Sequence, residues 1–79
     1  MRNSEESQFL EILGSIFREH RMAKNLSQEE LAHLSQFDRT YISLIERGKR
    51  NISILNIRRL ASSLDVTLSK LFEEISNAA

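Results

Sequence analysis

Hydrophobic residues recur along the chain at the three- and four-residue spacing of α-helices, in five separate stretches. We therefore expect helices near residues 6–24, 28–35, 39–47, 54–64 and 68–76. The second and third of these are short and are separated only by the corner at residues 36–38, which is typical of a helix-turn-helix. The pattern predicts an all-α fold in which the later helix of this pair is the recognition helix.

Each predicted helix directs one apolar face toward a shared core. The first helix is expected to bury Phe9, Leu13, Ile16 and Phe17, with His20 beside them. The central pair is expected to bury Leu31, Ala32, Leu34, Ile42 and Ile45. The fourth is expected to bury Ile54, Ile57, Leu60, Ala61 and Leu64. Gly14 costs a helix about 1 kcal/mol relative to Ala, so we expect close packing at that position.

Four helix starts share one local pattern, in which a polar cap follows an apolar residue. The predicted caps are Ser27, Asp38, Ser53 and Thr67. The residue before each cap can pack on the fourth residue of its helix as a hydrophobic staple. The staple pairs are Leu26 with Leu31, Phe37 with Ile42, Ile52 with Ile57, and Val66 with Leu71. Glu30 follows Ser27 by three residues, which adds a capping box.

The charges are segregated along the sequence, although the 79 residues carry no net charge. Residues 38–59 contain six basic residues against Asp38 and Glu46, whereas residues 1–17, 26–37 and 60–79 each carry a net charge of −2. A solvated surface would intersperse the two signs, so the segregation favours an anionic partner. The outer face of the recognition helix suits phosphates and base edges. It comprises Arg39, Thr40, Tyr41, Ser43, Leu44 and Arg47.

The composition indicates one small helical domain. The chain has no Pro and only two Gly, and the absence of Cys excludes disulfides and thiolate metal sites. No apolar run resembles a secretion signal or spans a bilayer, so we expect a soluble, cytoplasmic protein without a membrane partner. We expect a flexible N-terminus at residues 1–7 and a single domain at residues 8–79, with the motif at residues 27–47.

The fifth predicted helix carries an apolar stripe at helical spacing. The stripe comprises Leu68, Leu71, Phe72 and Ile75. On a short last helix it exceeds what the core of a small domain needs, and exposed apolar patches usually mark interfaces. We therefore expect a symmetric homodimer with a dimerisation region at about residues 52–76.

Residues 18–75 resemble the helix-turn-helix domain of lambda-type phage repressors, through the run SQEELA, through Ile42 and Ile45, and through Glu46 with Gly48. The run DRTYISLIERGKRN is similar, more narrowly, to the controller proteins of restriction–modification systems. The resemblance implies a five-helix, lambda-repressor-like regulator that binds paired half-sites in double-stranded DNA on the bacterial nucleoid. It would activate its own gene and an endonuclease gene at low level and repress them at high level.

The resemblance also implies roles for individual positions. Base contacts would come from Arg39, Thr40, Tyr41 and Leu44. Backbone contacts would come from Gln28, Ser43, Arg47, Arg50 and Asn51. Arg21 and Glu46 would form a structural ion pair, and Glu29 would contact RNA polymerase.

Two positions depart from the lambda-type pattern. Gln36 stands where Gly is common, at a corner whose backbone needs a positive φ, so we expect strain of about 1–2 kcal/mol. Leu44 stands where a polar base-reading residue is common. It could pack on a thymine methyl group or contact nothing.

Other functional classes fit the sequence less well. His20 and His33 lie on different helices without a nucleophile–base pair, and there is no Gly-rich phosphate loop, so we expect no enzyme, cofactor, metal or small-molecule substrate. A phage-type repressor, or an antitoxin-like interaction module with autoregulatory DNA binding, is the alternative. A steep fall of DNA affinity with salt, together with sequence preference, separates a regulator from an enzyme or a pure interaction module.

Overall fold

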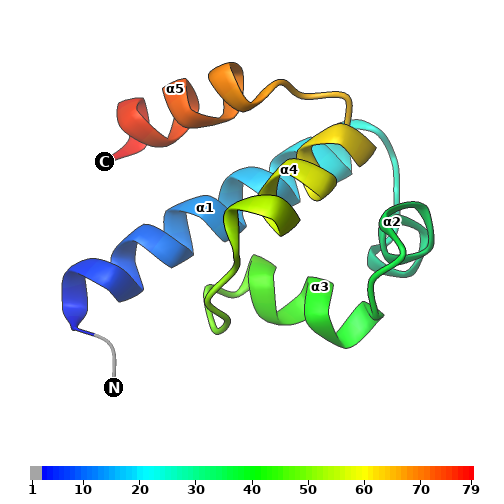
Figure 1. Ribbon diagram of the computed structural model, residues 1–79, viewed down its shortest axis with the longest axis horizontal. Helices are drawn as coiled ribbons and strands as arrows, with labels where there is room; N and C mark the ends of the chain where they lie inside the picture. Colours follow the sequence, from blue (N-terminus) through cyan, green and yellow to red (C-terminus); the bar gives the residue numbers. More distant parts are fainter. Residues whose placement is uncertain (1–2) are drawn as a thin grey trace.

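The computed structural model describes residues 3–79 as five α-helices joined by short connections (Figure 1). The helices are α1 (Ser4–Ala23), α2 (Gln28–Ser35), α3 (Arg39–Glu46), α4 (Ile54–Ser63) and α5 (Leu68–Ala78). The predicted all-α, five-helix fold is confirmed. Of the predicted flexible N-terminus, residues 1–2 lie outside the described residues, whereas α1 already begins at Ser4, two residues earlier than expected.

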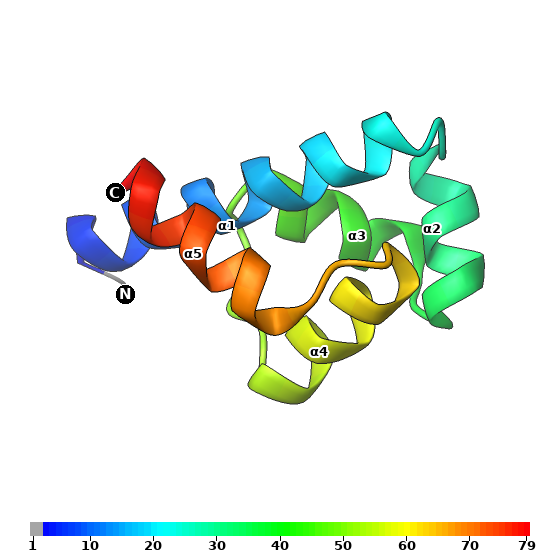
Figure 2. The ribbon, with the colours of Figure 1, turned by 90° about the horizontal axis from the view of Figure 1, so that it is seen from above.

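The long helix α1 runs through the middle of the fold. In Figure 1 α5 lies above α1, α2 and α3 lie below it, and α4 lies in front, whereas the view from above in Figure 2 shows α4 to one side of α1. Helix α1 packs against α3 and α5, and α2 packs against α3 and α4. The motif pair therefore rests on α1 and α4, and one side of α3 is left uncovered by other helices.

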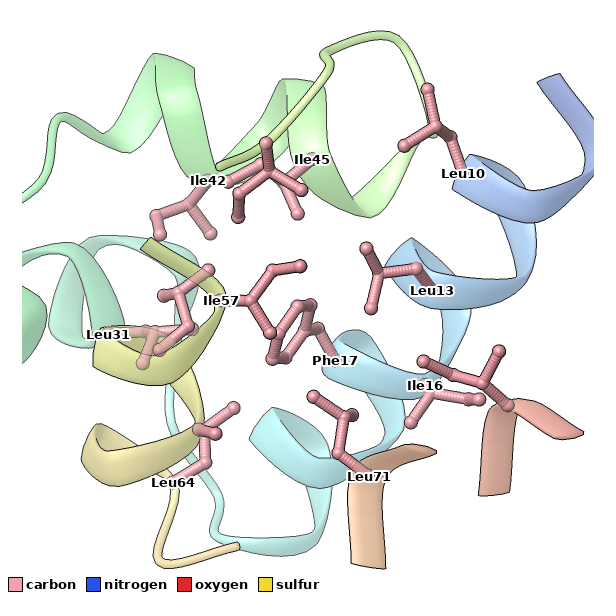
Figure 3. Packing of buried hydrophobic residues seen from close by; sticks show 14 of the residues in the cluster. Leu10, Leu13, Ile16, Phe17, Leu31, Ile42, Ile45, Ile57, Leu64 and Leu71 are labelled. Carbon is pink, nitrogen blue, oxygen red and sulfur yellow. The ribbon is translucent and has the colours of Figure 1, made fainter. Parts of the chain in front are cut away.

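Phe17 lies near the centre of the core, where side chains from all five helices meet (Figure 3). The helical periodicity placed most of these residues correctly, but three expected core residues are largely exposed. Phe9, Leu34 and Ile54 are 46%, 55% and 57% exposed. Each lies at the margin of its apolar face, and no neighbouring helix covers that margin. Leu10 and Ile52 are buried in addition to the expected set.

The stripe on α5 has to be reassigned in part. Leu71 and Ile75 are 0% and 5% exposed within the single chain, so they are core residues and cannot form a surface for a second copy. Their side of α5 packs on α1, where Ile16 and Phe17 are also buried. Leu68 is half-buried and packs against the core, whereas Phe72 is 38% exposed. Phe72 is the one exposed member of the stripe.

Polar caps begin every helix, largely as expected. Ser27 and Glu30 form the capping box, since Ser27 Oγ accepts from Glu30 N at 3.0 Å and Glu30 Oε1 accepts from Ser27 N at 2.8 Å. Ser53 and Thr67 cap α4 and α5 by accepting from Asn56 N and Lys70 N. Asp38 occupies the cap of α3, but its side chain makes no cap hydrogen bond. All eight staple residues lie in the core or pack against it.

A recurring left-handed residue ends four of the helices. Asn25, Gln36, Gly48 and Asp65 have φ of 57°, 61°, 69° and 58°. In each case the following N–H donates to the carbonyl five residues back, as in Phe37 N to Ala32 O at 2.9 Å, which is the Schellman arrangement. After α1, α2 and α4 the next two residues are an apolar residue and the cap of the following helix. Such a connection turns the chain sharply in three residues.

Gln36 adopts the left-handed conformation predicted for the corner and is exposed. We expect Gln36→Gly to raise the free energy of unfolding by about 1 kcal/mol, because Gly has no Cβ to clash at positive φ. The measurement is urea denaturation followed by circular dichroism. The matched control is Gln8→Gly, exposed within α1, which should lower stability by about 0.5–1 kcal/mol. Equal losses in both variants would contradict strain at the corner.

Candidate DNA-binding surface

The uncovered side of α3 begins with two free polar side chains. Arg39 and Thr40 are exposed in the first turn, and neither side chain has a hydrogen-bond partner within residues 3–79. An arginine in this state keeps all its donors for an external acceptor, and its planar fork matches guanine O6 and N7. The structure thus leaves these predicted base-contacting side chains available at the N-terminal end of the recognition helix.

Tyr41 is held between aromatic and basic side chains. Its ring centroid lies 4.9 Å from that of Phe37, with the planes tilted by 55°. The Arg50 guanidinium carbon lies 5.3 Å from the centre of the Tyr41 ring, and that of Arg59 lies 4.7 Å from the centre of the Phe37 ring. Cations over aromatic faces are attracted by the ring quadrupole. Tyr41 is half-buried and packed on both sides, whereas Arg39 is exposed.

Asn56, from the first turn of α4, is a site residue that sequence reasoning missed. Its Nδ2 donates to Tyr41 Oη at 2.9 Å across fifteen positions of sequence. Asn56 stands three residues after the cap Ser53, where a capping box would have Glu or Gln. The presence of Asn in place of Glu or Gln at this position was the one feature of the sequence that could have pointed to Asn56. Arg59 is one of the six basic residues of the segment 38–59, but the sequence predicted no contact for it.

A shallow hollow opens between α3 and the start of α4. Among its lining residues are Thr40, Tyr41, Leu44, Arg50 and Asn56. Three of the four predicted base-contacting residues thus share one concave surface with a predicted phosphate contact, and Arg39 stands outside it. Leu44 is half-buried in this wall, which is compatible with an apolar contact to a thymine methyl group.

Most of the predicted phosphate contacts gather at the end of α3 and on the connection that follows. Arg47, Arg50 and Asn51 are exposed there together with Lys49, to which no contact was assigned, and Arg47 Nε donates to the Ser43 carbonyl at 3.3 Å. This connection is the one that does not follow the three-residue pattern, since four further residues separate Gly48 from the cap Ser53. The additional length carries basic and amide side chains, which suits contact with a phosphate backbone.

Glu46, the last residue of α3, is the centre of a buried polar network. Arg21 donates to it from Nε at 2.7 Å and from Nη2 at 2.9 Å, and Gln28 Nε2 donates at 3.1 Å. The Arg21 and Glu46 side chains are 12% and 3% exposed, so the predicted ion pair is present and largely desolvated. Arg21 Nη1 also donates to the Leu26 carbonyl at 2.8 Å. Gln28 therefore braces the recognition helix.

Hydrogen bonding by the Glu46 carboxylate raises the pKa of Arg21 above its ordinary value, against the opposing effect of burial. A raised pKa in the folded state means that the stabilisation is complete below the unfolded pKa of arginine and is lost only as the pH rises through the folded value. The guanidinium therefore stays charged throughout the physiological range, and the ion pair is a permanent part of the fold.

Two close backbone approaches fix the same end of α3. A Cβ on Gly14 would lie 2.8 Å from the Glu46 carbonyl oxygen and would also clash with the Ile45 carbonyl, so the predicted close packing at Gly14 is confirmed. A Cβ on Gly48 would lie 2.8 Å from Glu11 Cα. Helix α1 thus contacts the C-terminal end of α3 at backbone distance, and any larger residue at Gly14 would displace the recognition helix.

The acidic start of α2 lies near the end of α3, to which Gln28 is joined by its hydrogen bond with Glu46. Glu30 is engaged with Ser27 in the capping box, and the backbone hydrogen bond from Ser27 lowers the pKa of Glu30. A lowered pKa makes this contribution complete above the unfolded pKa and lost as the pH falls through the folded one. Glu29 is exposed, and its side chain has no hydrogen-bond or ion-pair partner among residues 3–79.

Two kinds of feature do not occur in the part of the chain that the structure describes. None of its helices combines the length and the apolar character needed to cross a membrane. Its histidine and acidic side chains nowhere gather in a group of three that could hold a metal ion.

Comparison with known proteins agrees with this geometry. The helix-turn-helix family matches residues 17–71. The control protein C.MunI of Mycoplasma sp is 49% identical over 51 residues, covering 65% of this chain and 69% of that protein. The crystal structure of the restriction–modification controller protein C.AhdI from Aeromonas hydrophila is 51% identical, with a TM-score of 0.76, covering 80% of this chain and 96% of that one.

The crystal structure of a second controller protein contains DNA. The C.Esp1396I tetramer in complex with its natural 35 base-pair operator is 35% identical, with a TM-score of 0.81, covering 87% of this chain and 91% of that one.

Removal of the Glu46 carboxylate tests the buried network. We expect Glu46→Ala to lower the free energy of unfolding by about 3–5 kcal/mol, because Arg21 is left as an unpaired, largely buried charge. Urea denaturation measures the loss. The control is Glu73→Ala, which breaks an exposed 3.8 Å pair with Lys70 and should cost at most about 1 kcal/mol.

If Glu46→Ala does not fold, the double variant Arg21→Leu with Glu46→Leu should recover part of the loss, since no buried charge remains. A loss below 1 kcal/mol for the single variant would mean that water reaches Arg21 and pairs with it.

Proposed function

The chain belongs to the helix-turn-helix family and, within it, to the restriction–modification controller proteins, and from this premise we propose how it recognises and regulates its operator. It is a sequence-specific DNA-binding transcriptional regulator and not an enzyme. In our proposal α3 enters the major groove with its N-terminal turn. Arg39, Thr40, Tyr41 and Leu44 contact base edges there, and residues 47–51 follow the phosphate backbone.

The free side chains at the start of α3 are the observation that carries this proposal. The Arg39 and Thr40 side chains form no hydrogen bond within residues 3–79, whereas Arg21 and Gln28 donate hydrogen bonds to Glu46. Exposed, unpaired donors beside a hollow with an apolar wall match a base edge, which offers acceptors and a thymine methyl group. Ser43, Arg47, Arg50 and Asn51 would set the register without reading sequence. Gln28 would add a phosphate contact from its remaining amide capacity.

We propose that the protein binds operator DNA as an oligomer built from homodimers. C.Esp1396I binds its operator as a tetramer. In this chain, exposed apolar side chains remain in the predicted dimerisation region, at Ile54 and Leu55 on α4 and Phe72 on α5. Helices α4 and α5 are neighbours in both views (Figures 1 and 2). A two-fold dimer through these helices would place two recognition helices about 34 Å apart, one turn of DNA.

We propose further that the regulator activates its own gene and an endonuclease gene at low level and represses them at high level, in the cytoplasm of a bacterium. Activation would use Glu29. Its carboxylate has no partner among the described residues and stands at the acidic start of α2, near the end of α3. An unpaired acidic group in this place suits a basic patch on RNA polymerase already bound beside the operator.

Selection of DNA from a random pool tests the proposed readout, and Arg39 is the critical position. On the selected operator, Arg39→Ala should lose about 1–3 kcal/mol of binding free energy and relax the preference at one base pair per half-site. Fluorescence anisotropy titrations at fixed salt measure both effects. Lys70→Ala is the control, because Lys70 is exposed on α5, on the side of α1 opposite α3 (Figure 1). An equal loss on operator and random DNA would mean that Arg39 contacts only phosphate.

Leu55→Glu tests the dimer. Leu55 is 71% exposed in the first turn of α4, where a glutamate suits the helix dipole, so the substitution should leave the monomer fold intact. We expect it to shift a micromolar dimer toward monomer in sedimentation velocity. Met22→Glu is the matched control, since Met22 is 54% exposed but lies outside the dimerisation region. A wild-type monomer, or a dimer unaffected by Leu55→Glu, would rule this interface out.

Charge reversal at Glu29 separates activation from binding. We expect Glu29→Lys to abolish activation of a promoter reporter while leaving operator affinity equal or slightly higher, because a negative charge near DNA is removed. Glu73→Lys, an exposed acidic position on α5, is the control and should leave activation intact. Full activation by Glu29→Lys, or a parallel loss of binding and activation, would exclude the polymerase contact.

A further inference from the structure

The Tyr41 hydroxyl has a single partner within residues 3–79, the Asn56 side-chain amide. Asn56 Nδ2 donates to Tyr41 Oη at 2.9 Å. Both residues are half-buried, and both line the hollow between α3 and the start of α4. The Tyr41 ring is meanwhile packed against Phe37 and covered by Arg50, so the hydroxyl oxygen is fixed in position.

A phenol hydroxyl has one hydrogen to donate and oxygen lone pairs to accept with. The Asn56 amide occupies the accepting side. The hydroxyl hydrogen must then point away from Asn56, and no group in residues 3–79 receives it. The remaining direction is the open side of the hollow, where Thr40 and Leu44 also stand. An outside acceptor is needed to complete this hydrogen bond.

We propose that Asn56 is a positioning residue which makes Tyr41 a hydrogen-bond donor toward DNA, so that Tyr41 favours an acceptor atom. This inference rests on the proposed function, in which α3 enters the major groove. The acceptors available there are guanine O6 and N7, adenine N7 and thymine O4, together with phosphate oxygens. The amino groups of adenine and cytosine are donors, and they would compete with the Asn56 amide for the lone pairs of the hydroxyl oxygen, whereas an acceptor takes the free hydroxyl hydrogen directly.

The neighbouring basic residues support this assignment. The Arg50 guanidinium lies over the Tyr41 ring and places a positive charge beside the phenol, and the Arg59 guanidinium adds a second charge over the adjoining Phe37 ring. A positive field draws electron density from the hydroxyl oxygen and strengthens it as a donor. The same charges attract an acceptor that carries negative charge. The electrostatics and the hydrogen-bond polarity therefore point in the same direction.

The decisive variant is Asn56→Asp. An aspartate at this position offers only acceptor oxygens, so it receives the Tyr41 hydrogen and turns the hydroxyl inward. Asn56→Ala leaves the hydroxyl unpaired but free to donate outward. Aspartate also adds a negative charge near DNA, and this effect is isolated by making the same change in the Tyr41→Phe background, where no hydroxyl exists. The wild type, Asn56→Asp, Tyr41→Phe and the variant with both changes form a double-mutant cycle.

Operator affinity is measured by anisotropy titration at one salt concentration. We expect Tyr41→Phe to weaken binding about 3- to 10-fold, the size of one hydrogen bond. The loss of operator affinity caused by Asn56→Asp should be about 3–10 times larger when Tyr41 is present than in the Tyr41→Phe background. Asn56→Ala should be less damaging than Asn56→Asp after the charge effect is removed. Circular dichroism melting confirms that each variant is folded.

The base preference of Tyr41→Phe distinguishes the two sources of acceptor. Relaxed preference at one base pair per half-site identifies a base acceptor, and a uniform loss across sequences identifies phosphate. Equal penalties for Asn56→Asp in both backgrounds would overturn the inference, because Asn56 would then act without the hydroxyl. That result leaves the proposed function standing. Failure of the wild-type protein to prefer its selected operator over random DNA would instead reject the proposed function itself.

Discussion

The buried ion pair between Arg21 and Glu46 is the constraint on which the placement of the recognition helix depends. It joins the last turn of α1 to the last residue of α3, and Gln28 extends it to the first residue of α2. Such a pair is weak evidence for added stability, because desolvation offsets much of its attraction. Its value here is geometric, since a bidentate fork admits one orientation. With Gly14 at backbone contact, the C-terminal end of α3 is fixed and its N-terminal turn is left free.

The connections between helices are of two kinds, three short ones and a longer one after α3. Three of them use a left-handed residue, an apolar residue and a cap, so they turn the chain tightly and bury the apolar residue against the core. The connection after α3 is longer, because exposed Lys49, Arg50 and Asn51 precede its buried apolar residue, Ile52. The loop thus keeps its anchor in the core and adds basic and amide side chains that suit contact with a phosphate backbone. This departure from the repeated pattern supports the phosphate contacts proposed for residues 47–51.

Sequence reasoning reached the helices because caps, staples and 3.6-residue periodicity are local properties. It failed where the burial of a side chain depends on which helix packs against which face. Leu34 and Leu71 both belong to predicted apolar faces, yet Leu71 is buried on the α5 helix that packs against α1, and Leu34 is 55% exposed. The ion pair was reached through family resemblance, since residues 21 and 46 share no local signal. The Tyr41–Asn56 hydrogen bond was missed because its partners belong to different helices and match no motif.

Helix α4 connects the two proposed activities through adjacent residues. Asn56 holds the Tyr41 hydroxyl on the DNA-facing side, while Leu55 stands exposed on the side where we place a second copy. Consecutive residues on a helix differ in direction by about 100°, so one rigid turn serves both surfaces. The first turn of α4 is capped by Ser53, and Ile57 anchors it in the core. A dimer formed through α4 would therefore fix the separation of its two Tyr41 side chains as firmly as it fixes the subunits. The first turn of α4 would then both set the spacing between half-sites and orient the Tyr41 contact.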